Sequence, residues 1–169
     1  RSPSRGLGDV YKRQVCLSLG LSAADIAGRM PKLEAVAMRL EVKQGQHGCT
    51  LINDSYNSDI NSLDIALDFI SRRPDHKGRR RTLILSDILQ SGMTRDQLYA
   101  EVSELCVKRG VEKFIGVGPD LMAEADRIGV GEKYFFPDSQ TFIKSPVFST
   151  LRDEVILITV SYTHLTLPT

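Results

Sequence analysis

The first clear pattern along the chain is an alternation of apolar and polar residues between positions 38 and 52. Residues 38–43 alternate, residues 45–48 include two glycines, and residues 49–52 form a short, mostly apolar segment. A period of two places the apolar side chains on one face of a strand. Two such segments joined by a glycine-containing turn are typical of a hairpin. We therefore expect an antiparallel hairpin here.

Beyond residue 60, short apolar runs alternate with amphipathic segments. The apolar runs predict strands at residues 82–85, 114–117, 133–136 and 155–158. The amphipathic segments predict helices at 63–70, capped by Asn61 or Ser62, at 94–108, capped by Thr94 and stopped by Gly110, at 121–128 and at 140–144. Strands with almost no polar residues, alternating with helices, are typical of a parallel sheet covered on both faces. The predicted fold class is α/β, an open, mostly parallel, Rossmann-like sheet with helices on both faces and one entry hairpin.

The segment before about Arg39 does not fit this pattern. Ser22-Ala23-Ala24-Asp25 has the form of a capping box, ahead of a short helix that Pro31 must end. We expect this segment to be the end of a preceding domain.

The two ends of the chain encode one DNA element in opposite directions. Residues 9–14 back-translate as GAT GTG TAT AAG AGA CAG. The reverse complement, read from its third base, encodes Val-Ser-Tyr-Thr-His, which is the sequence of residues 160–164. This inverted element resembles the mosaic end used in transposon-based library preparation. We therefore expect residues 1–14 and 159–169 to be adapter-derived tails, with native sequence from Val15 to Ile158.

Composition and charge narrow the function classes. The apolar fraction is 41%, the charged fraction 25% and the formal net charge +1, as in an ordinary globular protein. So small a net charge gives no electrostatic argument for nucleic acid or an anionic membrane. No apolar stretch approaches the roughly 20 residues that span a bilayer. The basic run Arg79-Arg80-Arg81 precedes a predicted strand, and we interpret it as a solvated flank rather than a phosphate-binding patch.

The cysteines do not have the spacing of a metal site. Cys16, Cys49 and Cys106 are far apart, with no C-x-x-C pair and no nearby histidine. Each lies in an apolar context, so we expect buried free thiols in a reducing compartment.

Three predicted strands end in polar residues. Residues 53–57, Asn-Asp-Ser-Tyr-Asn, are the richest of these strand ends, and Ser86-Asp87 and residues 118–120 follow two other strands. Ligands of open α/β sheets bind beyond the carboxyl ends of the strands. Asp54 and Asn57 precede a helix N-terminus, where amides favour anionic ligands, and a carboxylate there suits a ribose hydroxyl or a metal-bound water. The alternative is that they only form Asx turns and a cap. The same ambiguity holds for Ser86-Asp87.

Other motifs argue against chemistry within this chain alone. Gly116-Val117-Gly118 lacks the third glycine of a dinucleotide fingerprint, because that position is Leu121, so we expect a tight strand-to-helix turn. His47 and His76 lie in a turn and a polar loop without partners. Neither a G-x-S-x-G nucleophile motif nor a phosphate-binding G-x-x-x-x-G-K-[ST] loop is present. The sequence predicts no catalytic residue and no metal site in this chain.

Several of these segments resemble the Mur ligase family of peptide ligases. Residues 51–57, with Ser62 and the Ala-Leu helix that follows, resemble the motif that opens the family's C-terminal domain. Residues 39–41 are similar to its Arg-x-Glu, residues 85–89 to its Leu-Gly-Asp-Met segment, and residues 155–158 to the strand before a Lys-Gly-Ser turn. The chain departs from the family at Asp59-Ile60, usually Asn-Pro, and at Ser86, usually Gly. The likeness covers nearly all of residues 15–158, with 15–38 matching the end of the central ATP-binding domain and 39–158 the C-terminal domain.

The resemblance implies a cytoplasmic, ATP-dependent ligase that joins D-alanyl-D-alanine to UDP-N-acetylmuramoyl-tripeptide through an acyl phosphate. It implies that Arg39 meets the phosphates of ATP, that Asp54 and Asn57 contact its ribose or base, and that Tyr56 and Asp87 line the cleft. The phosphate loop and Mg²⁺ ligands would belong to the central domain, so this chain alone should be inactive. The sequence also resembles members of the family in which an alanine racemase module follows the ligase. Pyridoxal phosphate is expected only with such a module.

Two alternatives remain open at the level of sequence. One is a nucleotide- or dinucleotide-binding α/β module of an unrelated enzyme, which the strand and helix pattern alone supports. The other is a non-catalytic interaction domain, which does not explain why polar residues gather at strand ends. A Gly-Lys-Thr phosphate loop upstream would distinguish the ligase from the first alternative.

Overall fold

The structure, a computed structural model, describes residues 40–54, 59–73, 78–89 and 91–160, together with residues 14, 17, 18, 20, 22, 24 and 25. The chain divides into two compact units, Arg1–Ala37 and Met38–Thr169. In the first unit the predicted capping box is present, because the backbone N–H of Ser22 donates to Asp25 Oδ2 and that of Asp25 donates to Ser22 Oγ, both at 3.1 Å.

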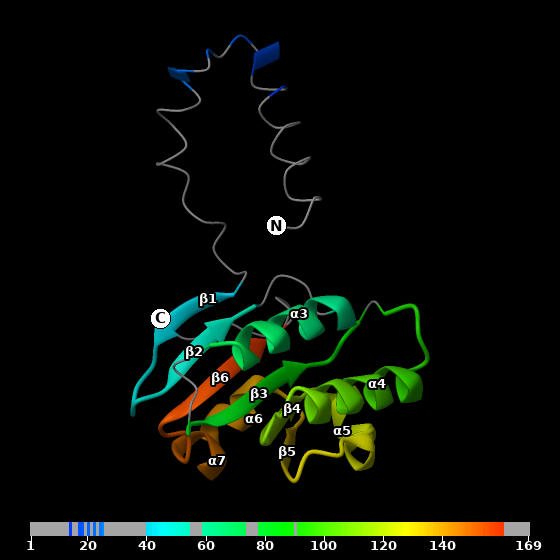
Figure 1. Cartoon of the computed structure of the whole chain (residues 1–169). Helices are drawn as coiled ribbons and strands as arrows, with labels where there is room; N and C mark the ends of the chain where they lie inside the picture. The colour runs from blue at the N-terminus through cyan, green and yellow to red at the C-terminus, as the bar shows by residue number, and fades with distance from the viewer. Residues whose placement is uncertain are drawn as a thin grey trace. The chain divides into compact units, whose positions relative to one another are not determined.

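The described part of the second unit is built on one six-stranded sheet with the order β1-β2-β6-β3-β4-β5 (Figure 1). The strands are β1 (Glu41–Gln44), β2 (Thr50–Asn53), β3 (Arg80–Ser86), β4 (Lys113–Val117), β5 (Glu132–Phe136) and β6 (Glu154–Thr159). β1 and β2 form the predicted antiparallel hairpin, and every other neighbouring pair is parallel. The predicted α/β class with a mostly parallel open sheet is confirmed.

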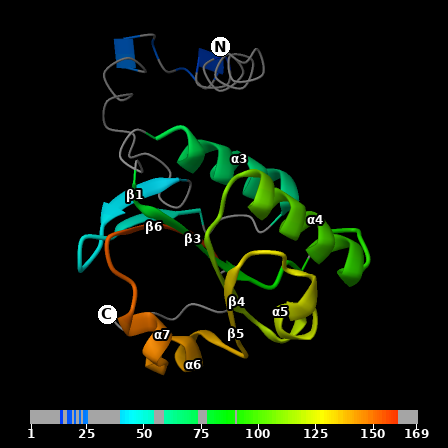
Figure 2. The ribbon, with the colours of Figure 1, turned by 60° about the horizontal axis from the view of Figure 1, so that its bottom comes forward.

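Helices cover both faces of the sheet. They are α3 (Ile60–Ser71), α4 (Arg95–Lys108), α5 (Pro119–Ala123), the 3-10 turn η3 (Ala125–Arg127), α6 (Ser139–Lys144) and α7 (Pro146–Ser149). Figure 2 shows α3, α4 and α5 on one side of the sheet and α6 and α7 on the other. Side chains alternate accordingly, because Leu83 and Leu85 pack in the larger core, with residues of α3 and α4, whereas Ile84 packs in the smaller one, with Phe142 of α6.

The start of α3 differs from the prediction. The cap is Asp59, not Asn61 or Ser62, and its Oδ1 accepts the backbone N–H of Ser62 at 2.8 Å. The helix is therefore longer at its start than the apolar pattern indicated. Ile60 occupies the first helical position, where proline is also well accepted. An Asn-Pro pair at Asp59-Ile60 would keep the same cap, so this departure from the family motif preserves the local geometry.

Two other helix predictions need changing. The helix expected at residues 121–128 begins at Pro119, ends at Ala123 and is followed by η3. The short helix α7, which proline opens, was not predicted. By contrast, the helix expected at 94–108 is confirmed, with Thr94 at its N-cap, although that side chain makes no capping hydrogen bond, and with Gly110 at a φ of 69° just beyond its end.

The basic run 79–81 is a solvated flank only at Arg80, which is exposed, because Arg79 and Arg81 are partly buried. Arg79 donates to Thr50 Oγ1 at 2.9 Å and to the carbonyl of Glu154 at 3.0 Å. Arg80 pairs with Glu132 at 2.7 Å, and Arg81 donates to the carbonyl of Arg109 at 3.1 Å. Arg79 and Arg80 thus join strands, and Arg81 joins β3 to the end of α4. The prediction fails for Arg79 and Arg81 because their partners are distant in sequence.

Two of the predicted thiols can be located. Cys49 and Cys106 are buried and free, and burial raises the pKa of the Cys106 thiol to about 12. Cys16 lies outside the described residues. Within the described ranges, no helix has the length and apolarity to cross a membrane.

Thr159, the last residue of β6, carries a buried hydroxyl without a hydrogen-bond partner, the one such side-chain atom among the described residues. We expect Thr159→Val to raise the free energy of unfolding by about 1 kcal/mol, because it replaces an unsatisfied hydroxyl with a methyl group of similar shape. Urea unfolding of the chain measures this.

Thr50→Val is the matched control, because Thr50 is equally buried but accepts a hydrogen bond from Arg79. It should lower the free energy of unfolding by about 1 kcal/mol. Destabilisation by both substitutions would contradict the assignment of an unsatisfied hydroxyl to Thr159.

Candidate functional site at the carboxyl ends of the strands

The carboxyl ends of four neighbouring strands meet at one edge of the sheet. Asn53 of β2 is in register with Ile158 of β6, and Leu85 of β3 is in register with Thr159 of β6. Ser86 of β3 is in turn level with Val117 of β4. The three polar strand ends found in the sequence therefore lie along the same edge, with β2 and β3 two strand spacings, about 10 Å, apart. This edge is the candidate site.

Asp54 is the site residue that the structure places at the end of β2. Its backbone N–H donates to the carbonyl of Ile158 at 2.9 Å, which extends the pairing of β2 and β6 by one residue. The residue is 7% exposed, so the carboxylate lies at the very edge of the core. Arg39 and Asn57, predicted with Asp54 to bind the nucleotide, and Tyr56, predicted to line the cleft, lie outside the described residues.

Asp87 follows β3 at the same edge and is only 3% exposed. Its Oδ1 accepts the backbone N–H of Leu121 at 2.8 Å, and its Oδ2 accepts that of Asp120 at 3.1 Å. Both are first-turn amides of α5, which have no partner inside a helix. Asp87 therefore caps α5 from another strand, a role that the sequence did not predict.

Gly118 makes this contact possible. A Cβ at this position would lie 2.3 Å from the carboxylate of Asp87. The backbone has a φ of 143°, in a region that residues other than glycine hardly adopt. The tight turn predicted here is confirmed. The first amides of α5 are already bonded to the buried carboxylate of Asp87. The start of α5 is therefore poorly suited to a pyrophosphate, which weighs against the dinucleotide-binding alternative.

Tyr99 of α4 completes the group. Its hydroxyl donates to Asp87 Oδ1 and accepts the backbone N–H of Ile88, both at 3.4 Å. Burial, and then the charge of Asp87, raise the pKa of Tyr99, so the hydroxyl stays protonated and remains a donor. Tyr99 was missed in the sequence, although its spacing of three residues from Val102 puts it on the buried face of the predicted helix.

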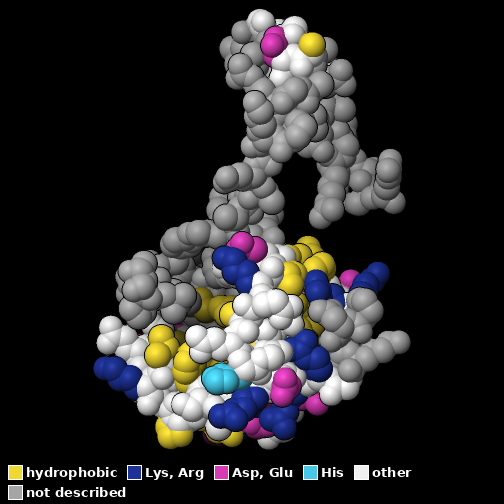
Figure 3. All heavy atoms as spheres, turned by 90° about the vertical axis from the view of Figure 1, so that its left-hand side faces the viewer, with side chains coloured by type: hydrophobic (Ala, Val, Ile, Leu, Met, Phe, Trp, Pro, Cys, Tyr) yellow, Lys and Arg dark blue, Asp and Glu magenta, His cyan; other side chains and the backbone are white. Residues whose placement is uncertain are grey.

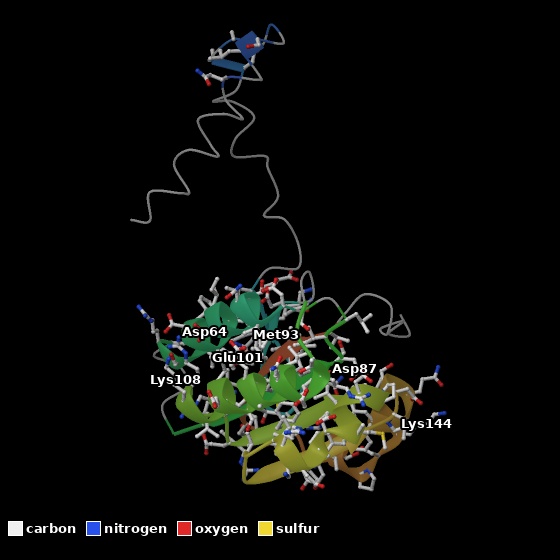
Figure 4. All side chains as sticks on the ribbon, turned by 90° about the vertical axis from the view of Figure 1, so that its right-hand side faces the viewer. Asp64, Asp87, Met93, Glu101, Lys108 and Lys144 are labelled. Carbon is white, nitrogen blue, oxygen red and sulfur yellow. The ribbon has the colours of Figure 1, made fainter. Side chains whose placement is uncertain are left out.

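The loop between β3 and α4, residues 87–94, has a buried residue that is hydrogen-bonded to Tyr99 and two exposed apolar side chains. Ile88 is buried, whereas Leu89 is 61% and Met93 39% exposed. Figure 4 shows Asp87 and Met93 toward one end of α4, with Lys108 at its other end. Gln90 lies outside the described residues. This loop and Asp54 are the parts of the edge that the structure places.

The charges at the edge are mostly paired. Arg95 in the first turn of α4 contacts Asp120 at 2.9 Å and Glu124 at 3.3 Å. Among the described residues no group of three or more His, Cys, Asp or Glu side chains is placed to hold a metal ion. A carboxylate such as that of Asp54 can accept a hydrogen bond from a hydroxyl group. On the side of the hairpin, Lys, Arg, Asp and Glu are interspersed with apolar side chains over the described surface (Figure 3).

The chain is similar in sequence to a curated ligase and in fold to several solved ligase structures. No protein-family model matches the chain. The UDP-N-acetylmuramoyl-tripeptide–D-alanyl-D-alanine ligase of Escherichia coli (strain K12) is 26% identical to the chain over 144 residues, which are 85% of this chain and 30% of that ligase.

Solved structures of such ligases have the same fold. The MurF ligase of Thermotoga maritima in complex with ADP has a TM-score of 0.59 at 17% identity, over 88% of this chain and 33% of that one. A MurF structure from Acinetobacter baumannii has a TM-score of 0.64 at 18% identity, over the same shares. The murein peptide ligase Mpl of Psychrobacter arcticus 273-4 has a TM-score of 0.54 at 13% identity, over 86% and 31%. The chain thus spans about a third of the length of the proteins it matches, and the structural likeness establishes its fold.

Proposed function

We propose that this chain is the C-terminal domain of a cytoplasmic Mur ligase that joins D-alanyl-D-alanine to UDP-N-acetylmuramoyl-tripeptide. The observation that carries the proposal is the 26% identity over 144 residues to the Escherichia coli ligase of that name. The fold adds support, because the polar motifs that resemble the family's motifs gather at one edge of the sheet, where ligands of open α/β sheets bind.

In this proposal residues 39–158 form the C-terminal domain and residues 15–38 end the central ATP-binding domain. Residues 1–14 and 159–169 are adapter-derived. A fused alanine racemase module, with pyridoxal phosphate, is an extension of the proposal that rests only on the resemblance of the sequence to fused members of the family.

The residues at the edge have separate roles in the proposal. Arg39 contacts the phosphates of ATP, and Asp54 and Asn57 form hydrogen bonds with its ribose or base. Tyr56 lines the cleft. Asp87 does not contact the nucleotide but holds in place the loop that follows β3. In this proposal Mg²⁺ is bound mainly by the preceding domain.

Bound ATP supplies the phosphoryl group that activates the tripeptide carboxylate for attack by the amine of D-alanyl-D-alanine. The contribution of this chain is to cover the nucleotide and keep water from the activated carboxylate. The chain by itself is therefore expected to be inactive, since it lacks a phosphate-binding loop.

In the intact ligase, Asp54→Ala and Asn57→Ala are expected to raise KM for ATP about tenfold, because each removes a hydrogen bond to the nucleotide. Initial rates of ADP release at varied ATP measure this. Asp54→Asn, which keeps the shape of the nearly buried side chain, separates loss of charge from loss of packing.

Asp126→Ala is the matched control, because Asp126 is an exposed carboxylate on η3. It should leave KM for ATP unchanged. If Asp54→Ala and Asn57→Ala behave like Asp126→Ala while the intact protein remains active, the assigned nucleotide contacts are wrong.

A further inference from the structure

Asp87 was predicted to line the ligand cleft, but its carboxylate points into the protein. It accepts two amides of α5, at 2.8 and 3.1 Å, and the hydroxyl of Tyr99 at 3.4 Å. The end of β3, the start of α5 and the buried face of α4 are thus joined through one carboxylate that is 3% exposed. A buried charge with this many donors is fixed in place.

The same group holds the loop between β3 and α4. The backbone N–H of Ile88 donates to the hydroxyl of Tyr99 at 3.4 Å. Ile88 is 5% and Tyr99 0% exposed, so water cannot easily replace either partner. The loop carries Leu89 and Met93, exposed at the candidate site, and its first two residues are the ones tied down. The rigidity of this loop therefore depends on the hydroxyl of Tyr99 and the carboxylate of Asp87.

We infer that Asp87 and Tyr99 are positioning residues, which hold residues 87–89 and 91–94 and the start of α5 in place as one wall of the nucleotide site. This inference rests on the proposed function. Neither side chain touches the ligand. They act by keeping the wall preformed, so that binding does not have to order it. Their loss should weaken ATP binding more than it slows the chemical step.

Tyr99→Phe is the sharpest variant, because it removes one hydroxyl and keeps the buried ring. In the 169-residue chain we expect amide hydrogen exchange of Ile88 to become about fivefold faster, since a hydrogen bond is lost. Exchange in β3 and β4 should not change. In the intact ligase we expect KM for ATP to rise about fivefold, with kcat within about twofold of the original value.

Tyr134→Phe is the matched control. Tyr134 lies on β5, and its hydroxyl also contacts one carboxylate, that of Glu132, at 3.4 Å, but it is 36% exposed and belongs to neither the loop nor α5. It should change neither exchange nor KM. Asp87→Asn is a second variant, which keeps the size of the side chain but loses the charge and one acceptor oxygen; it should act in the same direction as Tyr99→Phe.

The outcomes separate the inference from the function on which it rests. Unchanged exchange of Ile88 in Tyr99→Phe would overturn the anchoring itself. Faster exchange with unchanged KM for ATP would overturn the positioning role. Absence of ATP-dependent ligation in the unsubstituted intact protein would refute the proposed function and, with it, the role toward ATP, whereas the exchange result would still decide whether the loop is anchored.

Discussion

Gly118→Ala is expected to lower the free energy of unfolding by about 4 kcal/mol, because backbone strain and steric overlap add at this position. The backbone of Gly118 has a φ of 143° and a ψ of 159°, where an L side chain is strained whatever space it has. A Cβ would also lie 2.3 Å from the carboxylate of Asp87. That carboxylate cannot withdraw, since two amides of α5 hold it.

Gly92→Ala separates the two contributions. Gly92 has a φ of 68°, and a Cβ there would meet no atom within 4 Å, so only the backbone term remains, about 1 kcal/mol. Both variants are compared by urea unfolding at equal slope. A loss in Gly118→Ala no larger than that in Gly92→Ala would show that the turn and Asp87 can move apart at little cost.

Glu154→Leu is expected to lower the free energy of unfolding by about 3 kcal/mol, because it leaves the ammonium of Lys113 buried without its main partner. Lys113 Nζ lies 2.6 Å from Glu154 Oε1, and their side chains are 2% and 5% exposed. Thr82 Oγ1 donates to the other carboxylate oxygen. Glu132, at 3.6 Å from Lys113, remains as a second and weaker partner, which limits the loss.

The control is the double variant Lys113→Met/Glu154→Leu. Replacing both charges with apolar side chains removes the unpaired ammonium, so most of the lost stability should return. Glu132 keeps its contact with Arg80 at 2.7 Å. Thermal or urea unfolding of the three proteins gives the comparison. If the double variant is less stable than Glu154→Leu alone, the unpaired ammonium of Lys113 is not the cause of the lost stability, and this reasoning is wrong.

Much of the fold could be predicted because its strands are continuous apolar runs. The predicted segment 114–117 falls within β4 and 155–158 within β6, and both sit in the middle of the sheet, where both faces are buried. The order of the strands could not be predicted. β6 is last in sequence yet lies between β2 and β3, and only contacts between distant residues determine that position.

Two of the errors come from contacts between residues distant in sequence, and one from the local start of a helix. Arg79 was interpreted as a solvated residue because its partners, Thr50 and the carbonyls at the start of β6, are distant in the chain. Asp87 was placed at the right edge of the sheet, but its engagement by α5 depends on where β4 ends. Asp59 was overlooked as a cap because the apolar pattern of α3 starts later than the helix does.

The site itself is known in part. Asp54 and Asp87 lie at the edge that their positions after apolar strands predicted. Arg39, Tyr56 and Asn57 lie outside the described residues, so their roles toward ATP stay predictions. Resemblance and sequence identity support a ligase, and the geometry adds that the carboxylates of Asp54 and Asp87 both lie at this edge.

ADP release by the intact protein tests the central claim most directly. The protein that contains this segment should release ADP from ATP only when UDP-N-acetylmuramoyl-tripeptide and D-alanyl-D-alanine are both present, and omission of either should abolish the signal. The 169-residue chain alone should release none. ADP release by the intact protein that does not depend on either substrate, or none with all substrates present, would contradict the assignment of this chain to a peptidoglycan-precursor ligase.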